Sequence, residues 1–113
     1  MKQDHLSAAY GLIYEFRSGK FSAGSEISPE HLRLLHLLCE DILPGEAFAE
    51  DLLGELVPKI VATDSLWNRR TMALVDEFYA LREGGKLEAA EQQRNAFLRA
   101  CPPSWYREIA SSL

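Results

Sequence analysis

The sequence lacks most of the features that identify a chemical function. It has no GxSxG, GxGxxG or GxxxxGK[ST] motif, so it predicts neither a serine nucleophile nor a phosphate-binding loop. It also has no apolar run of roughly eighteen residues, which a membrane-spanning helix would need. Its first apolar stretch is interrupted by Glu15 and Arg17, unlike a secretory signal. We therefore expect a protein that is not an enzyme and does not enter a membrane.

Cysteine is scarce and shows no metal-binding spacing. Cys39 and Cys101 are the only two, and neither belongs to a CxxC pair. His36 and Cys39 stand three residues apart, but a structural zinc site needs four ligands and no second pair is present. We interpret the cysteines as small buried apolar residues in a reducing, cytoplasmic compartment, with a disulfide as the alternative. We expect no metal, no cofactor and no catalytic residue.

Segments of strand character are also missing. Threonine occurs only at Thr63 and Thr71, and no segment alternates between apolar and polar residues, whereas Leu, Ala, Glu and Arg are abundant. The pattern predicts an all-α fold, a compact irregular bundle of five to six helices. With 113 residues, the chain is expected to form a single helical domain over residues 1–113.

Capping residues and apolar spacing predict where the helices begin and end. We expect helices over about residues 4–18, 28–43, 46–62, 64–84, 86–100 and from 104 onward, with a loop over 19–27. The clearest start is Ser28 as N-cap with Pro29 in the first helical position. Asp4 is expected to cap the first helix, and Thr63 or Asp64 the fourth.

Proline inside the third predicted helix is expected to disturb it. The ring of Pro58 would clash with the carbonyl of Gly54, which predicts a kink or a division of that helix.

Positive charge is absent over one long segment, and this is the most informative feature of the chain. No lysine or arginine lies between Arg33 and Lys59. Six carboxylates do: Glu40, Asp41, Glu46, Glu50, Asp51 and Glu55. Residues 1–66 contain eleven acids and five bases, whereas residues 67–113 contain six acids and seven bases. Clustered carboxylates repel one another, so an uncompensated cluster costs stability; a solvated face and a partner-binding face are the two interpretations.

The overall charge narrows the class of partner. A net charge of −5 disfavours binding to nucleic acid and to anionic membranes, and it favours a basic protein partner. Arg69 and Arg70 follow Trp67, a combination that can contact phosphate, but salt bridges to Asp76 or Glu77 are the expected use of these arginines.

Two functional hypotheses follow. The first is a small acidic, non-catalytic protein-binding domain that uses the six carboxylates. Its most concrete form is an immunity or antitoxin protein that neutralises a basic toxin, such as a nuclease. The alternative is a self-associating structural or adaptor domain, a homodimer for instance. It would use a second apolar stripe on the fourth predicted helix, formed by Met72, Val75 and Tyr79. The other interpretation of this stripe is that it is buried against the C-terminal helices. Trp105 and Tyr106 are either a further anchor of such an interface or the contact that holds the last helix to the core.

Overall fold

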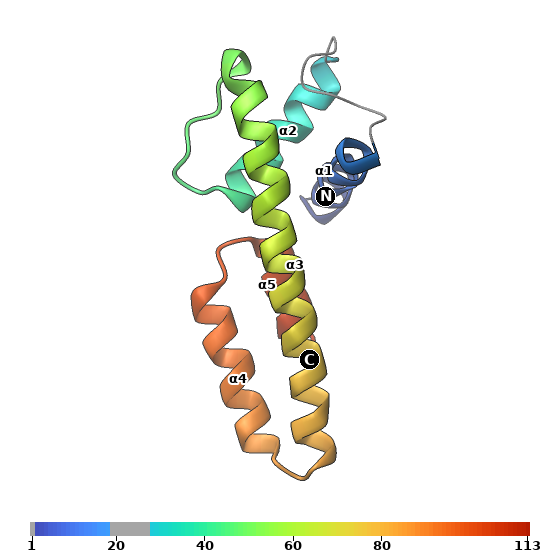
Figure 1. Cartoon of the computed structure of the whole chain (residues 1–113), viewed down its shortest axis with the longest axis vertical. Coiled ribbons are helices and arrows are strands. Elements are labelled where there is room, and N and C mark those ends of the chain that lie inside the picture. The colour runs from blue at the N-terminus through green and yellow to red at the C-terminus, as the bar shows by residue number, and fades with distance from the viewer. Residues whose placement is uncertain (1, 19–27) are drawn as a thin grey trace. The chain divides into compact units, whose positions relative to one another are not determined.

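The computed structural model describes residues 2–18 and 28–113, with all their side chains except those of residues 2–4 and 50. The helices are α1 (Lys2–Ser18), α2 (Pro29–Ile42), the short 3₁₀ helix η1 (Glu50–Leu52), α3 (Leu53–Glu83), α4 (Leu87–Ala100) and α5 (Ser104–Ser111) (Figure 1). Within these described ranges no strand occurs. The all-α prediction is therefore confirmed, with five α-helices. The loop expected over 19–27 lies outside the described residues.

The chain divides into two compact units, Met1–Asp64 and Ser65–Leu113, and α3 runs from one into the other. The charge divides at the same place. Residues 1–64 contain eleven acids and five bases, and residues 65–113 contain six acids and seven bases. The entire excess of negative charge thus belongs to the first unit. The expectation of one compact single-domain bundle stays a prediction.

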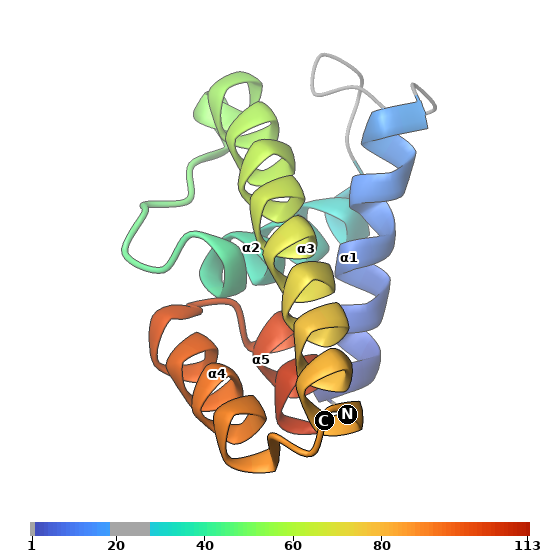
Figure 2. The ribbon, with the colours of Figure 1, turned by 60° about the horizontal axis from the view of Figure 1, so that its bottom comes forward.

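The core of the first unit is built by α1, α2 and the beginning of α3 (Figure 2). One cluster consists of Ala9, Ile13, Leu38, Cys39, Ile42, Leu56 and Ile60, and a second of Leu12, Leu35, Leu53 and Val57. Burying one such leucine or isoleucine stabilises a fold by about 1.5–3 kcal/mol, so the two clusters hold the three helices together. Leu35, Cys39 and Ile42 recur at helical spacing along α2, and all three are buried.

The start of α2 follows the sequence signal. Ser28 has an extended backbone (φ −67°, ψ 154°), and its hydroxyl accepts a hydrogen bond from the His31 N–H at 3.2 Å. Pro29 occupies the first helical position, where its missing N–H leaves no partner unsatisfied. The N-cap prediction for this helix is confirmed.

The second unit packs the second half of α3 against α4 and α5. Trp67, Thr71, Leu74 and Phe78 of α3 are buried, and the ring of Trp67 meets that of Phe97 edge to face with centroids 5.9 Å apart. The turn between α3 and α4 uses Gly85 at φ +76°, a conformation that residues with a side chain rarely adopt. The end of the fourth predicted helix near residue 84 is therefore confirmed.

Two predicted helices are one in the structure, so the predicted boundary at residues 63–64 is wrong. Thr63 and Asp64 lie inside α3. Asp64 caps no helix: its carboxylate accepts a hydrogen bond from Arg17 Nη2 at 3.0 Å and is nearly buried. A contact 47 residues away in sequence thus satisfies a side chain that otherwise favours a helix start.

Two further boundaries differ from the prediction. Residues 46–49 are not helical, and α3 begins only at Leu53 after η1. Pro58 lies within α3 and does not divide it, so a kink, the other predicted effect of Pro58, stays a prediction. Asp4 lies inside α1, which starts at Lys2, so it is not an N-cap.

Candidate functional site

The six acidic residues of the lysine- and arginine-free segment, here called the acidic face, lie along the chain from the end of α2 to the first turn of α3, on both sides of the connection between them (green in Figure 1). The last turn of α2 contains Glu40 and Asp41, and the connection contains Glu46. The 3₁₀ helix η1 contains Glu50 and Asp51, and the first turn of α3 contains Glu55. All six belong to the first unit. The side chain of Glu50 lies outside the described set.

The connection between α2 and η1 is held in place by its own side chains. The ring of Phe48 stacks on His36 with centroids 4.9 Å apart, and Phe48 also packs against both core clusters. The Glu46 carboxylate forms an ion pair with the Lys59 ammonium group of α3. These contacts link the connection to α2 and to α3.

Two carboxylates of α2 have partners within the chain. Asp41 is half-buried and accepts a hydrogen bond from the Tyr10 hydroxyl at 2.7 Å, which ties α2 to α1. Glu40 is exposed and lies 3.2 Å from Nε2 of His36, one turn earlier on the same helix. The structure thus gives Asp41 a role in packing through a neutral hydroxyl, and Lys59 compensates the charge of Glu46, so the cluster is partly compensated.

Asp51 and Glu55 differ from these residues. Both are exposed, and among the described side chains neither makes a hydrogen bond or an ion pair. They lie around the N-terminus of α3, where unsatisfied N–H groups stabilise a nearby carboxylate by about 0.3–1 kcal/mol. This local stabilisation offsets part of their mutual repulsion. Asp51 and Glu55 are the members of the acidic face that are most available to a partner.

Sequence reasoning did not find the partners of Asp41 and Glu46. Tyr10 lies 31 residues from Asp41, and Lys59 lies 13 residues from Glu46. No helical spacing relates such residues, so only the folded chain brings them together. The sequence offered no signal for either pair.

The field of the acidic face extends to the buried side of α2. Burial raises the pKa of the Cys39 thiol, and the carboxylates of Glu46 and Glu40 raise it further, against a smaller opposite effect of Lys59. The thiol is therefore protonated at neutral pH and poorly nucleophilic. Cys39 and Cys101 are both buried and form no disulfide, which confirms the interpretation of the cysteines as buried residues.

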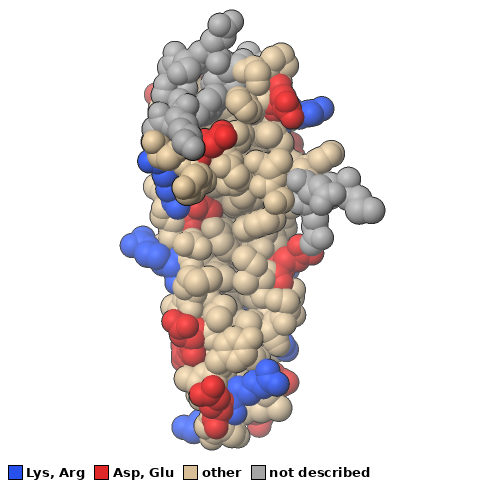
Figure 3. Space-filling model, turned by 90° about the vertical axis from the view of Figure 1, so that its right-hand side faces the viewer, with Lys and Arg blue, Asp and Glu red and all other residues tan. Residues whose placement is uncertain are grey.

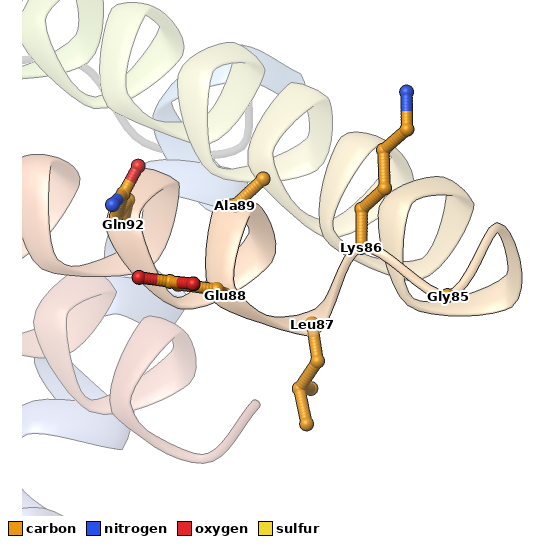
Figure 4. A pocket seen from close by; sticks show the side chains of 6 residues that line it. All are labelled: Gly85, Lys86, Leu87, Glu88, Ala89 and Gln92. Carbon is orange, nitrogen blue, oxygen red and sulfur yellow. The ribbon is translucent and has the colours of Figure 1, made fainter.

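Among the described residues, no three His, Cys, Asp or Glu side chains are grouped so that they could hold a metal ion. A shallow hollow at the α3–α4 turn is shown in Figure 4, where the side chain of Lys86 points away from that of Glu88. These two charged groups therefore do not converge on a common point. None of the described helices combines the length and apolar character needed to cross a membrane.

The second unit carries the residues of the alternative hypothesis. Met72 and Tyr79 are 51% and 47% exposed, and Val75 is half-buried, so this stripe is largely open to solvent. Tyr106 on α5 is buried, whereas Trp105 is half-buried.

The expected salt bridges of Arg69 and Arg70 are absent from the described residues. The Arg70 guanidinium instead lies 4.9 Å from the centre of the Trp67 ring, a cation–π contact. On the face drawn in Figure 3, acidic and basic side chains alternate, so those described form no patch of one sign there.

Comparison of the chain with protein-family models, with curated proteins and with solved structures finds no match.

Proposed function

We propose that this chain is a small acidic, non-catalytic protein-binding domain whose acidic face covers a basic site on another protein. The observation that carries the proposal is the exposed, unpaired state of Asp51 and Glu55 on a backbone that neighbouring contacts hold in place. The most concrete form of this function is an immunity or antitoxin protein that neutralises a basic toxin, such as a nuclease. The absence of a disulfide between Cys39 and Cys101 supports a cytoplasmic location.

Electrostatics gives this proposal its physical basis. The first unit contains eleven acids and five bases, so a cationic partner is attracted to this unit in particular. Such attraction raises association rates and acts over a distance of about 8 Å at physiological salt. A toxin that acts on nucleic acid presents a cationic site, because it must neutralise phosphates. A carboxylate surface of fixed geometry can occupy that site.

The test compares two double charge reversals of equal size. Asp51→Lys with Glu55→Lys changes the acidic face, and Glu88→Lys with Glu91→Lys changes exposed acids of α4 in the second unit. Tagged wild-type protein first captures its partner from the native host at low salt. Association rates of the purified partner with each variant are then measured by stopped flow at several salt concentrations.

We expect the Asp51/Glu55 variant to associate about tenfold or more slowly and with a flatter salt dependence, because steering depends on nearby charges. The Glu88/Glu91 variant should remain closer to wild type. Equal slowing in both variants would show that only total charge matters, and unchanged rates in the Asp51/Glu55 variant would remove the acidic face from the interface.

Self-association is the second candidate function, and the exposure of Met72 and Tyr79 favours it specifically. Exposed apolar side chains in register on one helix are typical of protein interfaces. Sedimentation equilibrium over a wide concentration range would then show a dimer that Met72→Asp abolishes. A strict monomer at all concentrations would eliminate this candidate.

A further inference from the structure

A groove of about 390 Å³ lies between α1 and α2 in the first unit. From α2, Leu34 and Leu37 form its apolar floor, and from α1, Ala8 and His5 line the opposite wall. Leu34 and Leu37 are half-buried because one side of each packs against the core while the other faces the groove. The sequence analysis did not single out this groove, because its two walls come from different helices.

Two exposed carboxylates stand at the ends of the apolar floor. Glu30 and Glu40 both line the groove and are separated by ten residues of α2, with Leu34 and Leu37 between them. At 1.5 Å per residue, the backbone positions of the two glutamates are about 15 Å apart along the helix axis, close to three helical turns. The groove thus has a glutamate at each end, with apolar surface and the guanidinium of Arg33 between them.

We propose that this groove receives one face of a basic amphipathic helix of the partner. Apolar side chains of that helix enter between α1 and α2, and lysine or arginine side chains about three turns apart pair with Glu30 and Glu40. The inference rests on the proposed function and adds the chemistry of the partner segment to it.

Charge complementarity supports a basic occupant. Among the described side chains, Arg33 is the one arginine or lysine that lines the groove, and it lies between the two glutamates in sequence. The groove belongs to the unit that carries the whole excess of negative charge, so a cationic helix is favoured over an acidic one. The histidines His5 and His36 also line the groove, and His36 is already close to Glu40.

The experiment uses an amphipathic leucine–lysine peptide as the probe and a serine–lysine peptide of equal length and charge as its control. Binding to the full-length, ¹⁵N-labelled protein is followed by amide chemical shifts. Ala8→Phe fills the groove from an exposed position of α1, and Ser7→Phe places the same ring at a neighbouring exposed position that does not line it. Circular dichroism verifies that both variants fold.

We expect the leucine–lysine peptide to shift amides around Ala8, Leu34 and Leu37, and Ala8→Phe to weaken its binding about tenfold or more, as expected for blocking a central pocket. Ser7→Phe and the wild type should bind alike, and the serine–lysine peptide should bind much more weakly.

Equal binding of both peptides, or equal affinity of Ala8→Phe and wild type, would overturn the groove as a docking site. If Asp51→Lys with Glu55→Lys abolishes binding of the native partner while Ala8→Phe does not, the groove inference fails and the acidic face remains. If neither variant alters that binding, the proposed function fails as well.

Discussion

Replacing Tyr10 by phenylalanine removes the hydroxyl that donates to Asp41 and leaves the aromatic ring in place. The change tests whether Asp41 serves the fold, as its half-buried position indicates, or stands free for a partner. Tyr14→Phe is the matched control, because Tyr14 lies one turn later on α1 and is 72% exposed.

The expected magnitude follows from the geometry of this contact. A hydrogen bond to a charged acceptor contributes about 1.5–3 kcal/mol, and a value near or slightly below the lower limit of that range applies here because both side chains are half-buried. We expect Tyr10→Phe to destabilise the protein by about 1–2 kcal/mol. With typical urea m-values this lowers the midpoint of unfolding by roughly 0.5–1 M.

A double-mutant cycle with Asp41→Ala isolates the contact. Urea unfolding is followed by far-ultraviolet circular dichroism for Tyr10→Phe, Asp41→Ala, the double variant and Tyr14→Phe. We expect a coupling energy of about 1 kcal/mol or more between Tyr10 and Asp41, and almost no effect of Tyr14→Phe. A coupling below about 0.3 kcal/mol, within the usual error of additivity, would refute the structural role of Asp41.

Three further predictions concern the remaining structure. Ser28→Ala should destabilise the protein by about 0.5–2 kcal/mol in urea unfolding, and Ser28→Asp should restore most of this, because either side-chain oxygen accepts from the His31 N–H. The pKa of the Cys39 thiol is raised from 9.0 in the folded state, so the stability that this thiol contributes is complete below about pH 9 and is lost as the pH rises through the folded-state pKa. The free energy of unfolding should therefore fall more steeply above about pH 9 for wild type than for Cys39→Ala. Both tryptophans, Trp67 and Trp105, belong to the second unit, so their fluorescence reports on that unit, whereas circular dichroism reports on the whole chain. If the continuous helix α3 couples the units, the two probes should show coincident urea transitions; separated midpoints would show two independent domains.

Local sequence determined the class of fold and several helix ends. Segments rich in leucine and alanine, with apolar residues at helical spacing, could be predicted as helices from local propensity alone. The Ser28–Pro29 pair marks the start of a helix because its capping bond lies within one turn. The glycines at the end of α3 act locally too, because Gly85 alone supplies the positive φ of the turn. Cys39 and Cys101 could be assigned to the core from their residue type and spacing.

The candidate site was only partly predictable. The segment that carries the carboxylates was visible in the sequence as a gap in positive charge, because the distribution of charged residues along the chain does not depend on the fold. Which carboxylates remain available was decided by partners far away in sequence, Tyr10 for Asp41 and Lys59 for Glu46. Asp51 and Glu55 are distinguished from the others only by this distribution of partners.

The same reason explains the errors in the helix boundaries and the groove that sequence reasoning missed. From its residue type Asp64 was a candidate N-cap, but in the structure it lies inside α3 and its carboxylate accepts a hydrogen bond from Arg17 of α1. The groove between α1 and α2 exists only once two amphipathic helices pack side by side. The sequence by itself determined what the backbone does within a few residues, and the tertiary structure decided everything that depends on contacts between residues distant in the chain.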